Sequence, residues 1–197
     1  MSVRRRIGVT AAAAAILLAG LLAWKLLVRP APDPSAVGGA FHLVDQSGRA
    51  VDESLLRGKV SAVFFGYTFC PDVCPTTLST LGRAMDIVVD PARGLQVVFI
   101  TVDPERDTAK ALAAYLASPS FPKATIGLTG TAAQVAAVAR AYHVFYQKAP
   151  EAGGGYTMDH SSVVYLMDRG GRFIRPLDVS LPPPEVARQL RTALAGG

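Results

Sequence analysis

The chain contains two cysteines, Cys70 and Cys74, and both stand in one short segment, GYTFCPDVCPTTL, with three residues between them. Two thiols at this spacing can form a disulfide, share a metal ion or attack a substrate. On a regular helix, positions i and i+4 have Cβ atoms about 5–6 Å apart, whereas a disulfide prefers about 3.8 Å. Pro71 and Pro75 keep the segment from being an ordinary helix interior, so the pair can adjust to either state. The spacing alone does not choose between a disulfide and a metal site.

The cysteines stand between an expected strand and an expected helix. The apolar run KVSAVFFGYT predicts a buried strand over 59–68, and a helix is expected over Thr76–Val89, with Pro75 in its first turn. The partial positive charge at a helix N-terminus stabilises a thiolate. The carboxylate of Asp72, between the cysteines, acts in the opposite direction. We therefore expect thiols that are activated but not strongly acidic.

A third ligand candidate is His160, in TMDHSS just before the apolar strand expected over Ser162–Asp168. In a thioredoxin-like chain order, the loop that enters this strand faces the cysteine turn across the end of the sheet. Thioredoxins carry a proline in this loop, and TMDHSS has none. Two thiols and one imidazole form a soft ligand set that suits copper or zinc. A structural zinc site needs a fourth ligand, whereas Cu(I) accepts few, soft ligands and can be passed on from such a site.

Other candidate side chains are expected to serve the structure. His42 and His143 stand at element ends and are assigned no chemistry. Met158 is expected to pack in the core, with a transient thioether contact to copper as a minor alternative. The run DPERD, Asp103–Asp107, predicts a turn with a helix cap and a local ion pair, close enough to a strand end for a role near the site or in partner contact. Gly153–Gly155 are expected to form a flexible loop that lets His160 move.

The remaining elements alternate between strands and helices. Alternation of this kind predicts a parallel sheet, and a site at the carboxyl end of a central strand is typical of open α/β sheets. We therefore expect an α/β, thioredoxin-like fold. Its other expected elements are an N-terminal hairpin over 41–56, strands over 95–103 and 124–128, a turn and helix over 103–117, a helix over 131–141 capped by Thr131, a hairpin over 162–177 with a glycine turn, and a closing helix over 184–195.

The N-terminal segment predicts a membrane anchor. Three arginines in a basic tail, 1–6, precede an apolar stretch, 7–28, which is long enough to span a bilayer. A Pro/Ala/Gly-rich tether, 29–40, then leads to one domain, 41–197. The alternative is a cleaved signal peptide. The arginines place the N-terminus in the cytoplasm of a single-pass inner-membrane protein, with the domain in the periplasm or an equivalent exported compartment.

The charge distribution and the size of the domain argue against two roles: nucleic-acid binding and a purely stabilising disulfide. The chain has 20 basic and 15 acidic residues, and five of the basic residues precede residue 30, so the rest carries no net charge. This distribution argues against nucleic-acid binding, which needs a basic patch on the folded domain. A domain of this size also folds without disulfide staples. Two thiols in an exported compartment therefore indicate a function of their own.

Three blocks of the sequence resemble the Sco family, also called SenC or PrrC, of membrane-anchored copper proteins: FFGYTFCPDVCPTTL, VFITVDPERDT and YTMDHSSVVYLMD. The likeness extends from about residue 40 to 195. It implies a thioredoxin-like domain that holds copper, as Cu(I) or Cu(II), through Cys70, Cys74 and His160. It also implies delivery of copper to the copper-centre subunit of cytochrome c oxidase, with another copper protein as donor, or reduction of the cysteines of that centre.

Three functions are therefore weighed. The first is a copper chaperone, in which a disulfide between Cys70 and Cys74 in the oxidised form would abolish metal binding. The second is a thiol-disulfide oxidoreductase that acts on the oxidase centre or on another exported partner. The third is a peroxidase, which is disfavoured because Val63 and Tyr67 stand where such enzymes carry proline and threonine. Replacement of His160 separates the first two, because only copper transfer needs the imidazole.

Overall fold

A computed structural model describes residues 37–88, 94–123 and 125–196. The contacts of the chain divide it into two units, residues 1–35 and 36–197, and the described residues belong to the second. The predicted basic tail, membrane anchor and most of the tether lie outside the described residues. Within the part of the chain that is described, no helix has the length and apolar character needed to cross a membrane.

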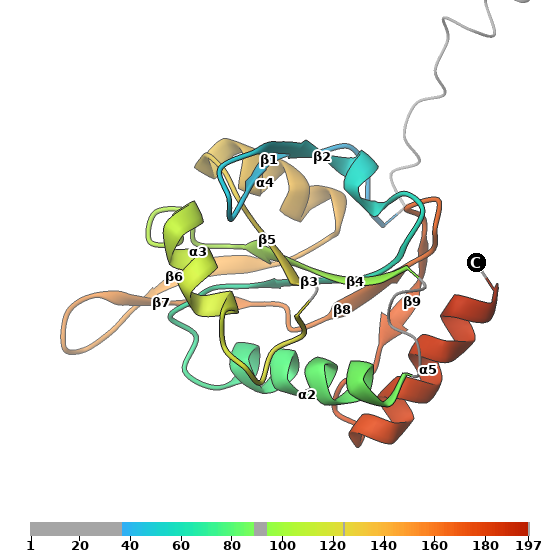
Figure 1. The fold of residues 1–197 in the computed structure, drawn as a ribbon. Helices are drawn as coiled ribbons and strands as arrows, with labels where there is room; N and C mark the ends of the chain where they lie inside the picture. The colour runs from blue at the N-terminus through green and yellow to red at the C-terminus, as the bar shows by residue number, and fades with distance from the viewer. Residues whose placement is uncertain (1–36, 89–93, 124, 197) are drawn as a thin grey trace, which may run out of the picture. The chain divides into compact units, whose positions relative to one another are not determined.

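The core of the domain is a seven-stranded sheet with the order β2-β1-β5-β4-β3-β8-β9 (Figure 1). Its centre is parallel: β3 (Val60–Gly66) pairs with β4 (Leu95–Thr101), and β4 pairs with β5 (Thr125–Thr129). Every residue of β3 and β4 is buried. Burial on both faces explains why these strands read as continuous apolar runs rather than as an alternating pattern.

Antiparallel strands extend the sheet on both sides. On one side β1 (His42–Asp45) pairs with β5 and with β2 (Ala50–Asp52), and the short 3-10 helix η1 (Glu53–Leu56) follows. On the other side β8 (Val164–Met167) pairs with β3 and with β9 (Phe173–Leu177). Both predicted hairpins are therefore confirmed, and so is the thioredoxin-like α/β fold.

Among the described residues the α-helices are α2, α3, α4 and α5, and α2 and α4 lie on opposite faces of the sheet (Figure 1). The helix α5 packs against α2. Thr108 caps α3 by accepting a hydrogen bond from the Ala111 amide, and Thr131 caps α4 in a reciprocal capping box with Gln134. The helix bounds are Val73–Ile87 for α2, Ala109–Leu116 for α3, Ala132–Ala141 for α4 and Pro183–Gly196 for α5.

The helix α2 begins earlier than predicted. Its first residue is Val73, with Asp72 at the N-cap, so Cys74 lies inside the first helical turn while Cys70 precedes the helix. Pro75 falls at the third helical position, where the backbone N–H needs no partner within the helix. The two cysteines therefore occupy different backbone environments.

A second, two-stranded sheet was not predicted from the sequence. β6 (Tyr146–Pro150) pairs with β7 (Tyr156–His160), with Tyr146 opposite His160. The expected loop over Gly153–Gly155 is confirmed, and Gly154 and Gly155 adopt positive φ angles of 86° and 92° in it. It forms the tip of a hairpin, because the residues on both sides of the glycines pair with each other. His160 therefore stands at the base of a hairpin.

Candidate metal centre

The cysteine loop connects the end of β3 to the start of α2. Cys70 is half-buried, whereas Cys74 is completely buried. The Cys70 amide donates to the carbonyl of Tyr67 at 3.2 Å, and the Cys74 amide donates to Cys70 Sγ at 3.3 Å. Both cysteines are free thiols in this structure. The loop thus presents one sulfur near the surface and one beneath it.

His160 faces the buried sulfur from the other side. Its Nε2 lies 3.5 Å from Cys74 Sγ, and its Nδ1 lies 3.0 Å from the carbonyl oxygen of Ser161. A carbonyl oxygen can only accept, so Nδ1 carries the proton and Nε2 keeps a lone pair that is available to a metal. A backbone carbonyl that fixes the tautomer in this way is typical of metal-binding histidines. The imidazole also packs edge-on against the Tyr67 ring, with centroids 5.8 Å apart.

The three donor atoms, Cys70 Sγ, Cys74 Sγ and one imidazole nitrogen of His160, lie within 4.8 Å of one another. A metal bound about 2.3 Å from each of two sulfurs separates them by at most about 4.6 Å. The three donor atoms are therefore close enough together to share one metal ion. Two sulfurs and one nitrogen form a soft set that suits Cu(I) or zinc. The structure therefore brings together the three residues singled out from the sequence.

The electrostatics of the two thiols differ. The pKa of Cys70 lies well below its ordinary value, because the Cys74 thiol and the Cys74 and Asp72 amides donate hydrogen bonds to the Cys70 thiolate. The pKa of Cys74 is raised, because its proton is held by Cys70 and burial disfavours a second thiolate. The carboxylate of Asp72 accepts from Thr76 Oγ1 at 3.2 Å. The expectation of two thiols that are activated but not strongly acidic is therefore wrong, because one thiolate is stabilised at the expense of the other.

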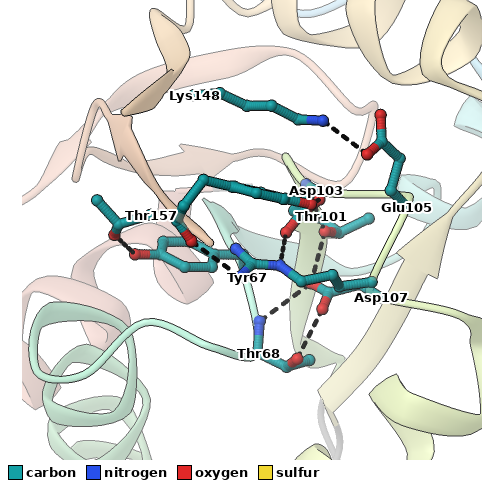
Figure 2. A network of polar contacts seen from close by, with 10 residues as sticks. Tyr67, Thr68, Thr101, Asp103, Glu105, Asp107, Lys148 and Thr157 are labelled. Atoms are coloured by element: carbon teal, nitrogen blue, oxygen red, sulfur yellow. Dashed lines mark hydrogen bonds and ion pairs between the residues drawn. The ribbon is translucent and has the colours of Figure 1, made fainter. Parts of the chain in front are cut away.

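The side chain of Asp107 links the cysteine loop to strand β4 by hydrogen bonds. Its buried carboxylate accepts from the Thr68 amide at 3.0 Å, from Thr68 Oγ1 at 2.6 Å and from Thr101 Oγ1 at 2.6 Å. Thr68 lies two residues before Cys70, and Thr101 ends β4. Figure 2 shows Thr68 and Thr101 beside Asp107. Burial raises the pKa of Asp107, although these hydrogen bonds oppose the shift. The predicted DPERD turn therefore reaches the site through its last residue.

Arg106 joins the same turn to the β6–β7 hairpin. Its guanidinium lies 3.8 Å from the centroid of the Tyr156 ring and 4.6 Å from that of Phe69, and Nη1 donates to the Tyr156 carbonyl at 2.9 Å. It also forms the predicted local ion pair, with Asp103. Asp103 in turn accepts from the Tyr156 hydroxyl at 2.9 Å. The turn, the cysteine loop and the hairpin thus meet around one side chain.

Two further contacts hold the hairpin in place. The Tyr67 hydroxyl and Thr157 Oγ1 are hydrogen-bonded at 2.6 Å, and Lys148 pairs with Glu105 at 2.6 Å (Figure 2). The first contact joins the cysteine loop directly to β7, three residues before His160. The distance between the imidazole and the sulfurs is therefore set by contacts between three separate segments.

Comparison of the sequence with known proteins identifies the family of the chain. The sequence model of the SCO1/SenC family matches residues 29–195. The chain belongs to the SCO1/SenC family. Its relatives include the mitochondrial protein SCO1 homolog 1 of Arabidopsis thaliana, 40% identical over 74% of this chain and 43% of that protein. A SCO2-like protein of Rickettsia conorii is 37% identical over 81% of this chain and 78% of that protein.

The fold of this SCO1/SenC chain is also that of solved relatives. The structure of Bradyrhizobium japonicum ScoI with copper bound superposes with a TM-score of 0.74 at 44% identity, and the match covers 80% of this chain and 99% of that chain. The aligned part of the Arabidopsis protein is less than half of its length.

The remaining side chains considered from the sequence lie elsewhere or pack as expected. Met158 is buried in the core, and it also lines a cavity of about 270 Å³ that includes Cys70 and His160. His42 lies exposed in β1, and His143 lies exposed just after α4. Sequence reasoning missed the contributions of Tyr67 and Thr157, and for Arg106 it found the ion pair within DPERD but not the contacts with the hairpin. The available signal was position, because Tyr67 and Arg106 stand at or beyond the carboxyl ends of neighbouring parallel strands.

Proposed function

We propose that this chain is a membrane-anchored copper chaperone that binds copper through Cys70, Cys74 and His160 and delivers it to the dinuclear copper centre of cytochrome c oxidase. The observation that carries the proposal is the convergence of two sulfurs with the Nε2 of an imidazole whose Nδ1–H is engaged by the Ser161 carbonyl. Soft thiolates favour Cu(I) over harder ions. A related protein of known structure has copper bound.

The two sulfurs are buried to different depths, and this difference favours release of the metal as well as its binding. Cys70 is half-buried and lies in the cavity next to His160, whereas Cys74 is enclosed. Thiolates of an acceptor can therefore replace the ligands in order, beginning with the exposed sulfur. Stepwise exchange keeps the copper coordinated throughout, so it need not be released into water.

The apolar stretch over 7–28 supports the anchoring part of the proposal. With the N-terminus in the cytoplasm, the domain faces the periplasm or an equivalent exported compartment. The copper-centre subunit of the oxidase is the proposed acceptor, and a second copper protein is the proposed donor. Anchoring is tested by washing membranes with high salt, which should leave the full chain attached and release a chain that begins at residue 29.

A thiol-disulfide oxidoreductase is the second candidate, and the different exposure of the two sulfurs favours it. The Cys70 thiolate would attack a partner disulfide, form a mixed disulfide and release one partner thiolate. Cys74, after loss of its proton, would attack Cys70 Sγ, form the Cys70–Cys74 disulfide and release the second partner thiolate. The partner disulfide gains two electrons and the cysteine pair loses two.

The decisive experiment is anaerobic Cu(I) titration of the reduced full chain against a competing chelator. Wild type should bind one copper per chain. Cys70→Ser, Cys74→Ser and His160→Ala should each lower the affinity by at least about a hundredfold, since even residues that only support ligands contribute about 10–100-fold. His42→Ala is the matched control, because it removes an exposed imidazole distant from the cysteines.

Disulfide exchange is measured on the same variants. If His160→Ala binds Cu(I) as tightly as wild type while either cysteine variant abolishes exchange with a protein disulfide, the chaperone proposal fails and the oxidoreductase takes its place. If His160→Ala loses copper but exchanges disulfides at the wild-type rate, the metal site stands.

A further inference from the structure

An apolar groove runs away from the candidate metal centre between the start of α2 and the strands β8 and β9. It encloses about 520 Å³, and its apolar lining includes Val73, Val163, Pro176 and Val179. The smaller cavity beside Cys70 and His160 shares Asp72, Val73 and Ser162 with it. The two hollows therefore adjoin each other, and a chain lying in the groove would have one end near the exposed sulfur.

The groove displays apolar side chains that are not covered. Val73 is 46% exposed and Val163 is 36% exposed. The two valines flank the ligands in sequence, because Val73 stands between the cysteines and Val163 lies three residues after His160. Phe69, next to Cys70, and Phe145, whose carbonyl accepts from the Ser161 amide, are also exposed, at 62% and 59%. Exposed apolar side chains that gather around a hollow are typical of interaction sites.

The charge of this surface has one sign. Among the residues that the structure describes, the carboxylates that line the two hollows are those of Asp72, Asp159 and Asp178, and no lysine or arginine lines either one. Among the described residues, none of these three carboxylates has an ion-pair partner. The Asp178 carboxylate accepts from the amide and hydroxyl of Ser180, which fixes its position at the groove. A complementary ligand is therefore apolar at its centre and basic at its ends.

We propose that this groove docks an extended polypeptide segment of the copper acceptor, with apolar side chains between Val73, Val163 and Val179 and basic side chains beside Asp72 and Asp178. The inference rests on the proposed function, because it assigns the groove to the partner that receives the metal. Docking there brings the acceptor thiols to Cys70, the more exposed sulfur. Apolar contact holds the segment, and the carboxylates select its charge and speed the encounter.

The first test measures docking without copper or thiols. Two cysteine-free peptides, acetyl-Lys-Leu-Val-Leu-Lys-amide and its Glu-ended counterpart, are titrated into the reduced, metal-free full chain in detergent and followed by NMR. The basic peptide should shift amides around the groove and bind at least about fivefold more tightly than the acidic one, with a difference that shrinks as salt rises. Equal binding of the two peptides, or no binding of the basic one at millimolar concentration, overturns the proposal.

The second test measures Cu(I) transfer to the copper-centre domain of the oxidase from the same organism. Val163→Asn removes apolar contact without adding charge, and Asp178→Asn removes charge while keeping the acceptor for Ser180. Each should slow transfer about threefold to tenfold. The matched controls are Ile87→Asn and Asp86→Asn, at the C-terminal end of α2. The exposed fraction of Ile87, 37%, is close to the 36% of Val163. The controls should transfer copper at the wild-type rate.

The Cu(I) affinity of every variant separates the two proposals. If wild type and variants bind Cu(I) equally and only the groove variants transfer slowly, the docking groove stands. If groove variants and controls transfer at equal rates, it falls while the metal site survives. If wild type does not bind Cu(I) but the basic peptide still occupies the groove, the chaperone function falls and docking of a basic, apolar segment survives.

Discussion

The sulfur of Cys74 occupies the space that a side chain at Gly66 would need. A Cβ added to Gly66 would lie 2.8 Å from Cys74 Sγ and 2.8 Å from Cε2 of Phe99. Both neighbours are completely buried, and Cys74 is held in the first turn of α2. Neither can retreat into open space. The last residue of β3 must therefore lack a side chain for the buried sulfur to reach His160.

Gly66→Ala should consequently damage the metal centre and the fold together. The added methyl group must displace the sulfur or the phenyl ring, and overpacking of this kind costs about 1–3 kcal/mol of unfolding free energy. Because Cys74 Sγ moves relative to His160, the Cu(I) affinity should fall about tenfold or more, as measured by chelator competition.

Gly153→Ala is the control for this substitution. A Cβ at Gly153 meets nothing within 4 Å, and its φ is not positive. Its stability and Cu(I) affinity should match those of wild type. Wild-type Cu(I) affinity in Gly66→Ala would contradict the view that this close approach positions Cys74.

Asp107→Ala should loosen the cysteine loop. Three donors on Thr68 and Thr101 lose their buried acceptor, and an unmet buried donor costs about 1–3 kcal/mol. The free energy of unfolding should fall by about 3 kcal/mol, partly offset because a buried carboxylate is removed. The Cu(I) affinity should fall as well, because Thr68 lies two residues from Cys70. Asp86→Ala, at an exposed carboxylate of α2, should change neither quantity.

The same variant should alter the acid dependence of stability. Burial raises the pKa of Asp107 in the folded chain, so the folded state holds this proton more tightly than the unfolded state. The stabilisation is complete below the unfolded pKa and is lost as pH rises through the folded pKa. In Asp107→Ala, the free energy of unfolding should no longer show this decrease as the pH rises through the folded pKa of Asp107. An unchanged curve in chemical unfolding would mean that Asp107 does not titrate as proposed.

The sequence predicted the features that depend on long apolar runs and on chain order. Val60–Gly66 and Leu95–Thr101 are buried on both faces, so their sequences carry a continuous apolar signal. The thioredoxin-like chain order then places the turn after β3 and the loop before β8 at the same end of the sheet. Chain order alone therefore predicts that His160 lies close to the cysteines.

The β6–β7 hairpin was not predictable on the same basis. Most of β6 is exposed, so its sequence, YQKAP, shows little apolar periodicity. The hairpin is fixed by Arg106 and Tyr67, which lie far from it in the chain. The divergence of the two thiols was missed for a related reason. The difference between the two thiol pKa values depends on how deeply each sulfur is buried and on a hydrogen bond between the two cysteines. The spacing of the cysteines in the sequence predicts neither feature.

Arg106→Lys should keep the charge but weaken the junction between hairpin and cysteine loop. The planar guanidinium stacks on Tyr156 and reaches Phe69 while donating to Asp103 and to the Tyr156 carbonyl. An ammonium cannot reproduce this set of contacts. We expect a loss of about 1–2 kcal/mol in unfolding free energy and faster amide hydrogen exchange in β6 and β7.

The Cu(I) affinity of Arg106→Lys reports positioning rather than general stability. A looser hairpin places His160 less accurately, so the affinity should fall about threefold to tenfold, within the range for residues that support metal ligands. Arg188→Lys, which changes the exposed pair with Glu185 on α5, is the matched control and should leave affinity and exchange unaltered. Equal Cu(I) affinity in both variants would show that the junction stabilises the hairpin without orienting the imidazole.

The two thiols of the reduced, metal-free chain should react at different pH. The pKa of Cys70 is lowered chiefly by the hydrogen bond from the Cys74 thiol, so Cys70 should be alkylated by iodoacetamide at neutral pH. Cys74, whose pKa is raised by Cys70 and by burial, should remain unmodified under the same conditions. Mass spectrometry of peptides assigns the reacting residue. Equal reaction of both cysteines only near the ordinary thiol pKa of about 8.5 would contradict this assignment.

Two substitutions at Cys74 isolate the cause of this difference. Cys74→Ser keeps a hydroxyl donor near Cys70, so the Cys70 pKa should stay low, whereas Cys74→Ala removes the donor and should raise it. The lowered pKa of Cys70 makes the folded state bind fewer protons than the unfolded state, so its contribution to stability grows as pH rises from the folded to the unfolded pKa. The contribution of Cys74 has the opposite sign and is lost at alkaline pH. Reduced wild type should therefore gain stability from weakly acidic to neutral pH, and Cys74→Ala should lose most of that gain.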